Sequence, residues 1–461
     1  MSAICSTTKW ICVAAALVMP LPLSAQIQYS LDQAVTRAQQ IDPWLRGSEL
    51  REQSMLDRGV AAGQLPDPRV SINMANLPLD SLNFGSEPMT QLQIGVSQVF
   101  PRGEKLALES RQFRELSERQ PMMRADRKAR VAANVTTLWL DAFFYGETIR
   151  LLEQDRTLFE DLVDVVQSRY ANSLGKTRQQ DLVRAQLELT RLEDRIARMQ
   201  SQKESSERML AEWLYERASD YPGFAEIQLT ETLPQLSLRD HETVYVGADS
   251  EKKHGSGSER TLVEYLLEHP AILSLDQKIL AQNTGVEVAH QAYKPQWGVN
   301  AAYGYRDEDR MGVKRSDFFS IGISLDIPLF TENRQDRQVQ SAVSEAEALK
   351  TDRALALRQM RSRFESARAE LLRLDQRRQL YQSRLLDEMR QQAEAAMVAY
   401  TNDEGDFAEV IRARIDELNA RIEALSIEIE RRKAIAQLNY FLFSTDSSAN
   451  SNNNAAVRDN S

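Results

Sequence analysis

Residues 295–328 contain two stretches in which apolar residues alternate strictly with small or polar ones. In the second stretch Ile321, Ile323 and Leu325 are separated by Gly322 and Ser324. This period of two is typical of a strand whose two faces meet different surroundings. A face of glycine, serine and asparagine opposite an aromatic and aliphatic face is typical of a strand between lipid and a narrow, wet interior.

The same hairpin occurs earlier in the chain, displaced by 227 residues. Because several separate landmarks coincide under one displacement, the sequence predicts a tandem duplication. Each copy holds two strands, at 69–100 and 296–328, and four strands cannot close a barrel. Either the sheet is open and soluble, or several chains supply the remaining strands. The coinciding landmarks are Pro43 with Pro270, Pro68 with Pro295, residues 94–97 with 321–324, and Pro101 with Pro328.

Apolar residues at heptad spacing predict long coiled-coil helices after each hairpin. Each copy is expected to have one long helix and two shorter ones that lie end to end beside it. At about 1.5 Å per residue, a helix of about 70 residues gives a rod on the order of 100 Å long. So thin a rod exposes much apolar surface, which favours an oligomer. The predicted helices are 31–63, 104–170, 182–215, 261–293, 331–400 and a last one from 407; Pro121 is expected to bend the second.

The chain begins with a pattern typical of a secretory signal peptide, residues 1–25. Both cysteines lie inside it, so the mature chain is expected to have no thiol and no disulfide. The mature chain then divides into repeat 1 (26–218), a linker (219–258), repeat 2 (259–443) and a disordered tail (444–461) rich in serine and asparagine. The chain has 57 Lys and Arg against 67 Asp and Glu, a net charge of −10. This charge argues against nucleic acid as a partner and is compatible with cationic cargo.

No pattern in the sequence indicates an enzyme, a cofactor or a metal site. The four histidines are scattered without the spacing of a metal-binding helix, and no nucleophile elbow or phosphate-binding loop is present. We therefore expect no catalytic residue and no cofactor.

Two tip motifs resemble those of the TolC-like outer-membrane factors. Residues 170–185 have the pattern Tyr-x(4)-Gly-x(5)-Asp-Leu-Val-x-Ala, and residues 400–413 are a second copy that is two residues shorter. Residues 63–68 and 97–103 are similar to the CzcC-like branch, which serves heavy-metal efflux. The resemblance implies a homotrimer with a 12-stranded barrel in the outer membrane of a Gram-negative bacterium and a helical tunnel through the periplasm. It also implies docking to a periplasmic adaptor (membrane fusion protein) and a proton-driven RND-type inner-membrane pump.

The resemblance also assigns candidate sites, most of them at the helical turns. The acid that closes each tip motif, Asp181 or Glu409, is expected near the periplasmic constriction. The turn 403–406 also carries three acids within four positions. Such a charge run is usually a solvated surface, but on a threefold axis it would form a ring of carboxylates that favours cations. Alternatively, Asp181–Arg184 and Glu409–Arg412 are simple ion pairs at helix starts. The candidate gate residues are Asp181, Arg184, Asp403, Glu404, Asp406, Glu409 and Arg412; the candidate docking residues are Ser173, Leu174, Gly175, Asn402 and Gly405.

The alternation of each strand assigns the lipid-facing side of the barrel. The expected lipid-facing residues are Val70, Ile72, Ile94, Val96, Trp297, Val299, Ile321, Ile323 and Leu325.

The fold class expected from the sequence is therefore mainly helical, with a transmembrane β-barrel to which each chain gives four strands. The expected function is that of the outer-membrane exit duct of a tripartite efflux system exporting heavy-metal cations. Two alternatives stay open. One is a duct of the same fold for drugs or type I secretion substrates. The other is a periplasmic coiled-coil adaptor, against which the alternating strands argue.

Overall fold

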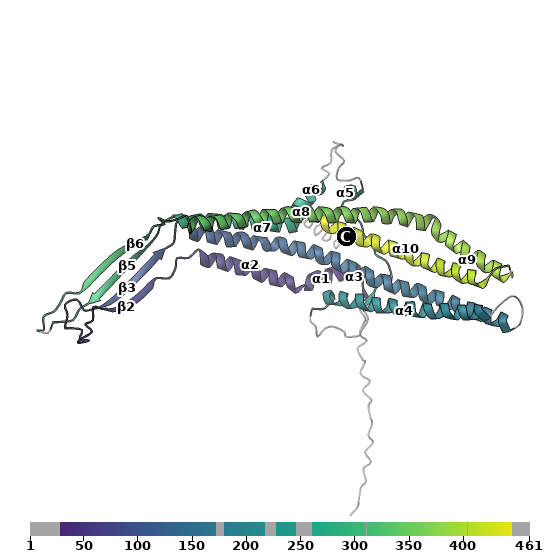
Figure 1. Cartoon of the computed structure of the whole chain (residues 1–461), viewed down its shortest axis with the longest axis horizontal. Coiled ribbons are helices and arrows are strands. Elements are labelled where there is room, and N and C mark those ends of the chain that lie inside the picture. The colour runs from purple at the N-terminus through teal and green to yellow at the C-terminus, as the bar shows by residue number, and fades with distance from the viewer. Residues whose placement is uncertain are drawn as a thin grey trace, which may run out of the picture.

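A computed structural model shows the chain as a long, slightly curved rod (Figure 1). A four-stranded sheet lies at one end, and the paired ends of α3 with α4 and of α9 with α10 lie at the other. The structure describes residues 28–171, 179–216, 227–245, 261–309, 311–402 and 404–444. The predicted signal peptide lies outside these residues, as do parts of the predicted linker and nearly all of the predicted tail.

The sheet is antiparallel throughout, with strand order β2-β3-β5-β6. It joins the two hairpins predicted from the sequence, because β3 of the first pairs with β5 of the second. The strands are β2 (Arg69–Ala75), β3 (Gln91–Phe100), β5 (Gln296–Tyr305) and β6 (Phe318–Asp326). A second, parallel pair is formed near the middle of the rod by β1 (Gln28–Tyr29) and β4 (Gln228–Leu229).

The first set of helices is built around α3, which alone spans about 100 Å at 1.5 Å per residue over its 67 residues. It continues as one helix through Pro121. The shorter helices α2 and α4 pack against α3 and follow one another along it in Figure 1, which is the arrangement that the helix lengths predicted. The helices are α1 (Leu31–Ile41), α2 (Pro43–Ala62), α3 (Lys105–Ala171) and α4 (Gln179–Leu214).

The second set repeats this plan with α8 and α9 as the long element. Helices α7 and α10 pack against α8, and α7 and α10 also pack against α3, which joins the two sets side by side. A small helix, α5 (His241–Tyr245), lies near the middle of the rod in Figure 1. The remaining helices are α6 (Leu262–Glu268), α7 (Pro270–His290), α8 (Gln335–Leu380), α9 (Leu386–Thr401) and α10 (Phe407–Phe441).

Three predicted helices are wrong in their continuity. The helix expected over 31–63 is interrupted at Asp42. The helix expected over 261–293 is interrupted at His269 and ends in a 3₁₀ turn, Gln291–Tyr293. The helix expected over 331–400 begins at Gln335 and contains a π-helical turn, Tyr381–Leu385. The first two breaks share a cause: the residue before a proline is driven out of the helical region, so Pro43 and Pro270 each begin a new helix.

The two breaks use different side chains as helix caps. Asp42 accepts a hydrogen bond from the Trp44 N–H at 3.0 Å, and Arg127 pairs with it at 2.7 Å. At the equivalent place His269 is fully buried, and its Nδ1 accepts the Ala271 N–H at 3.2 Å.

The second ring nitrogen of His269 lies 3.0 Å from the carbonyl oxygen of Tyr440. Only a neutral ring with its proton on Nε2 satisfies both contacts. Burial lowers the pKa of His269, an effect that Asp126 opposes and Arg130 reinforces.

Candidate functional site

One face of the sheet is apolar and exposed. Residues opposite each other in the ladder lie on the same face, and Ile72 pairs with Ile94 while Val299 pairs with Ile323. Ile72 is 70% exposed and Ile323 is 69% exposed. All nine candidate lipid-facing residues lie on this face, each exposed or half-buried: Val70, Ile72, Ile94, Val96, Trp297, Val299, Ile321, Ile323 and Leu325.

The opposite face carries small and uncharged polar side chains over most of its height. Ser97 pairs with Asn300, and Asn300 pairs with Gly322. A Cβ added at Gly322 would lie 2.8 Å from Oδ1 of Asn300, and one added at Gly95 would lie 2.9 Å from Oγ of Ser71. Glycine therefore leaves the space that the neighbouring Asn300 and Ser71 side chains fill on this face.

Aromatic rings lie toward both ends of the apolar face. Phe100 stacks on Trp297 with ring centroids 5.1 Å apart, and Phe84 stacks near Tyr305 at 6.2 Å. Strand β5 has 10 residues, and a tilted transmembrane strand typically needs about 9–11 residues. Outer-membrane strands typically have an apolar band between two aromatic girdles. The sheet has the strand length and the side chains of such a wall.

Arg102 ties the sheet to the helices, a role that sequence reasoning missed. Its guanidinium donates to the carbonyl oxygens of Lys294 at 2.7 Å and Ala292 at 3.3 Å, and forms an ion pair with Asp326 at the end of β6. The side chain is 16% exposed. An arginine between Pro101 and Gly103 directly after a strand was a visible signal, but its partners lie about 190 to 220 residues away.

The turn between α9 and α10 forms one helical tip. The N–H groups of Glu404 and Gly405 both donate to the carbonyl oxygen of Ala399, at 2.9 and 3.0 Å. A Cβ on Gly405 would lie 3.0 Å from the backbone nitrogen of Tyr400, so this close turn favours glycine. Of the candidate docking residues, Asn402 and Gly405 lie in this turn; Ser173, Leu174 and Gly175 lie outside the described residues.

The candidate gate acids differ in their surroundings. Asp181 is buried in the first turn of α4, at 6% exposure. Asp406 caps α10, accepting the Ala408 N–H at 3.3 Å. Glu404 and Glu409 are exposed, as are both candidate arginines, and Asp403 lies outside the described residues.

The simpler interpretation of the tip acids stays a prediction for the pair Asp181–Arg184. Within the described part of the chain, Glu409 and Arg412 form no salt bridge. Glu404 and Glu409 are exposed, so their carboxylates face solvent.

One apolar cluster joins the two helical arms behind the tips. Ala185 of α4 belongs to the same cluster as Val410 and Ile411 of α10. Polar contacts reinforce it: Arg195 donates to Asn419 at 2.7 Å, and Arg421 pairs with Asp155 at 3.0 Å. The structure thus brings the two arms of one chain together near the tip, which spacing alone could not show.

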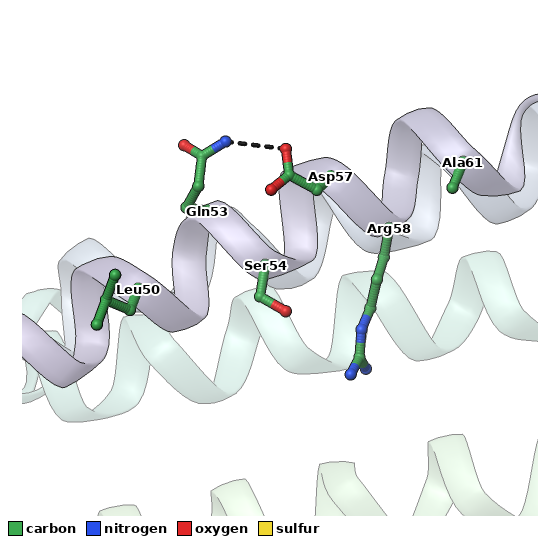
Figure 2. A pocket seen from close by; sticks show the side chains of 6 residues that line it. All are labelled: Leu50, Gln53, Ser54, Asp57, Arg58 and Ala61. Atoms are coloured by element: carbon green, nitrogen blue, oxygen red, sulfur yellow. Dashed lines mark hydrogen bonds between the residues drawn. The ribbon is translucent and has the colours of Figure 1, made fainter.

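The exposed side of α2 has a shallow hollow, shown in Figure 2. All of its lining residues come from this one helix, and Gln53 donates to Asp57 at 2.9 Å. Leu50 is 56% exposed at its edge. A site on a single helix, with no polar groups converging from other elements, lacks the features of a small-molecule pocket. The lining residues are Leu50, Gln53, Ser54, Asp57, Arg58 and Ala61.

The described residues contain no cluster of three or more His, Cys, Asp or Glu side chains placed to hold a metal ion. Of the helices that the structure describes, none combines the length and the apolar character needed to cross a membrane.

Comparisons with known proteins identify the fold. No family model matches the sequence, and no curated protein matches it either. CusC, which forms a transmembrane channel, is 14% identical with a TM-score of 0.69 over 91% of this chain and 93% of its own. The outer membrane protein VceC of Vibrio cholerae is 14% identical, with a TM-score of 0.69 over 90% and 96%. The CmeC outer membrane channel of Campylobacter jejuni is 15% identical, with a TM-score of 0.71 over 92% and 88%. The chain has the fold of these outer-membrane channel proteins.

Proposed function

We propose that this protein is the outer-membrane exit duct of a tripartite, proton-driven efflux system and works as a homotrimer. The observation that carries the proposal is the four-stranded sheet with one apolar and one polar face, held at the end of a helical rod about 100 Å long. In water the apolar face would be an exposed patch. In a membrane it would meet lipid, and the polar face would line a pore.

Three copies complete the barrel. Four strands leave the outer edges of β2 and β6 without a neighbour in the described chain, and a membrane does not tolerate such edges. Three copies supply twelve strands and close the sheet. The hollow of Figure 2 and the exposed Leu50 and Val60 on α2 also leave a helix face on which a second copy can pack.

The helical rod extends into the periplasm and ends in the two tips. Among the described residues, the tips lie at the end of the rod opposite the sheet and would face an inner-membrane pump, so they are where an adaptor docks. In this assignment Asn402 and Gly405 contact the adaptor together with Ser173, Leu174 and Gly175.

Heavy-metal cations are the proposed cargo. Glu404, Asp406 and Glu409 lie on the solvent side of the second tip, and with Asp403 they would form a ring of carboxylates on a threefold axis. Such a ring attracts cations, and the net charge of −10 acts in the same sense. Drugs and secreted proteins are the competing cargoes.

Deletion of the gene tests the cargo. A deletion strain should become sensitive to divalent metal salts, and the intact gene should restore resistance. Sensitivity to drugs alone would assign the duct to a drug pump. The duct itself is tested by fractionation: the protein should be found in the outer membrane as a trimer whose gel mobility changes on heating. A monomer in the soluble periplasmic fraction would indicate an adaptor instead.

A further inference from the structure

The two outer edges of the sheet are complementary. Strand β6 runs antiparallel to β5 and β2 runs antiparallel to β3. In the order β2-β3-β5-β6, the next strand beyond β6 must therefore run as β2 does if the antiparallel pattern continues. Both edges carry exposed apolar residues on the same face: Val70 and Ile72 on β2, Ile323 and Leu325 on β6. A second copy of this chain supplies the missing strand.

We propose that β6 of one copy pairs with β2 of the next in one defined register, with Ser324 opposite Asn73. The inference rests on the proposed trimer and adds to it the residue pairing of the seam between copies.

The register follows from the internal repeat. Within the chain, β3 and β5 form the seam where the second strand of one repeat meets the first strand of the other. Here Ser97 pairs with Asn300, and Gly95 pairs with Ala302. The pairing of β6 with β2 of the next copy is equivalent to the pairing of β3 with β5, because β6 is the second strand of its repeat and β2 is the first strand of its own.

Moving each seam residue by the repeat displacement of 227 gives the pairs between copies. Ser97 moves to Ser324 and Asn300 moves back to Asn73; Gly95 moves to Gly322 and Ala302 back to Ala75. Both pairs keep their residue types, serine with asparagine and glycine with alanine.

The lipid face also stays continuous in this register. Leu325 lies opposite Ile72, and Ile323 lies opposite Met74. All four are more than 50% exposed in the single chain. Pairing them removes both edges and joins the apolar faces of neighbouring copies into one band.

The hairpins set the alternatives to this register. Ser97 pairs with Arg69, whereas Ser324 pairs with Gly298 and not with Gln296, the repeat equivalent of Arg69. The two hairpins therefore differ by two residues. A seam displaced by the same amount would place Ser324 opposite Ser71 or Ala75. The register with Ser324 opposite Asn73 keeps serine paired with asparagine and glycine paired with alanine, as at the seam within the chain. We therefore favour this register over the two displaced ones.

Charge complementarity supports the same seam. Arg69 begins β2 on the polar face and forms no ion pair within the described residues, while Asp326 ends β6 on that face with its side chain 67% exposed. In the proposed register Asp326 lies opposite Ser71 of the next copy, so Arg69 is its diagonal neighbour. Diagonal positions are about 7–8 Å apart, within reach of an arginine. Asp326 would then lie between Arg102 of its own copy and Arg69 of the next.

Cysteine pairs test the register. Ser324→Cys is combined in turn with Ser71→Cys, Asn73→Cys or Ala75→Cys, and the trimer is oxidised in outer membranes. Within one chain β2 and β6 are three strand spacings apart, about 14 Å, which is too far for a disulfide. Every bond therefore joins two copies, and the band on a non-reducing gel shifts from one chain to three. We expect this shift when Ser324→Cys is combined with Asn73→Cys. We expect no shift with Ser324→Cys alone, or when Ser324→Cys is combined with Ile72→Cys on the other face of β2.

Each other outcome has a separate meaning. Covalent trimers with Ser71→Cys or Ala75→Cys in place of Asn73→Cys would overturn the register and keep the trimer. Covalent trimers with Ile72→Cys would overturn the assignment of faces. Trimers that assemble but crosslink with none of the pairs would show that these edges do not meet. Absence of any trimer in unmodified protein would overturn the proposed function as well.

Discussion

Replacing Ile321 by arginine tests which face of the sheet meets lipid. Ile321 is 72% exposed on the apolar face. It pairs with Ala301, which lies midway along β5 between the aromatic residues Trp297 and Tyr305. The side chain should therefore lie near the middle of the bilayer.

The cost follows from this depth. An arginine on the lipid face costs about 2–4 kcal/mol at the midplane and about 0–1 kcal/mol near the interface. In a trimer with three copies, Ile321→Arg should thus destabilise the barrel by about 6–12 kcal/mol in total. Leu325→Arg, which is level with Trp297, should cost much less. Ser320→Arg, one residue away on the polar face, should leave assembly intact and change conductance.

The assay measures the fraction of trimer on unheated gels of outer membranes, together with refolding into lipid vesicles over a series of urea concentrations. Trimer yield should fall in the order Ser320→Arg, Leu325→Arg, Ile321→Arg. If Ser320→Arg is as damaging as Ile321→Arg, the two faces do not differ in their surroundings and the lipid assignment is refuted.

Three further changes test the joints and the tip. His269 has a pKa lowered by burial, so its contribution to stability should be complete above about pH 6.5, the unfolded value, and should be lost as pH falls below it. Thermal melts should show this loss of stability at low pH. The variant His269→Asn keeps a cap acceptor and should remove the pH dependence of the melting temperature. A variant with the same pH profile as the wild type would contradict this role of His269. Arg102→Ala should destabilise the sheet–helix joint by about 2–3 kcal/mol, the cost of a lost charged hydrogen bond. Urea unfolding of the trimer measures this loss against Arg124→Ala, which removes an ion-pair arginine on α3. Equal losses in the two variants would show that Arg102 has no special role at the joint. The double variant Glu404→Gln, Glu409→Gln should lower cation preference in single-channel recordings without changing trimer yield, and wild-type selectivity would place the gate elsewhere.

The strands and their two faces could be predicted from the sequence, but their order in the sheet and the pairing of β3 with β5 could not. Alternation fixes which residues share a face, and it placed Ile321 and Gly322 on opposite sides without any structure. Heptad spacing predicted the long helices for the same reason, since both patterns are local and repeat many times.

Contacts between distant parts of the chain could not be predicted in this way. The partners of Arg102 and the link between Arg421 and Asp155 depend on how separate helices are placed. The breaks at Asp42 and His269 were visible as residues before proline, yet the apolar pattern continues through them. Asp406 shows a further limit: the run of acids at 403–406 made it a gate candidate, while the structure shows that its carboxylate also caps α10.

The central claim is a threefold duct closed by twelve strands in the outer membrane. Electron cryo-microscopy of the particle extracted from outer membranes tests it most directly. The account predicts three copies around one hollow axis, with a single twelve-stranded barrel at one end and three pairs of helical tips at the other. A particle with one or two copies, or three copies each with a separate open sheet, would contradict it.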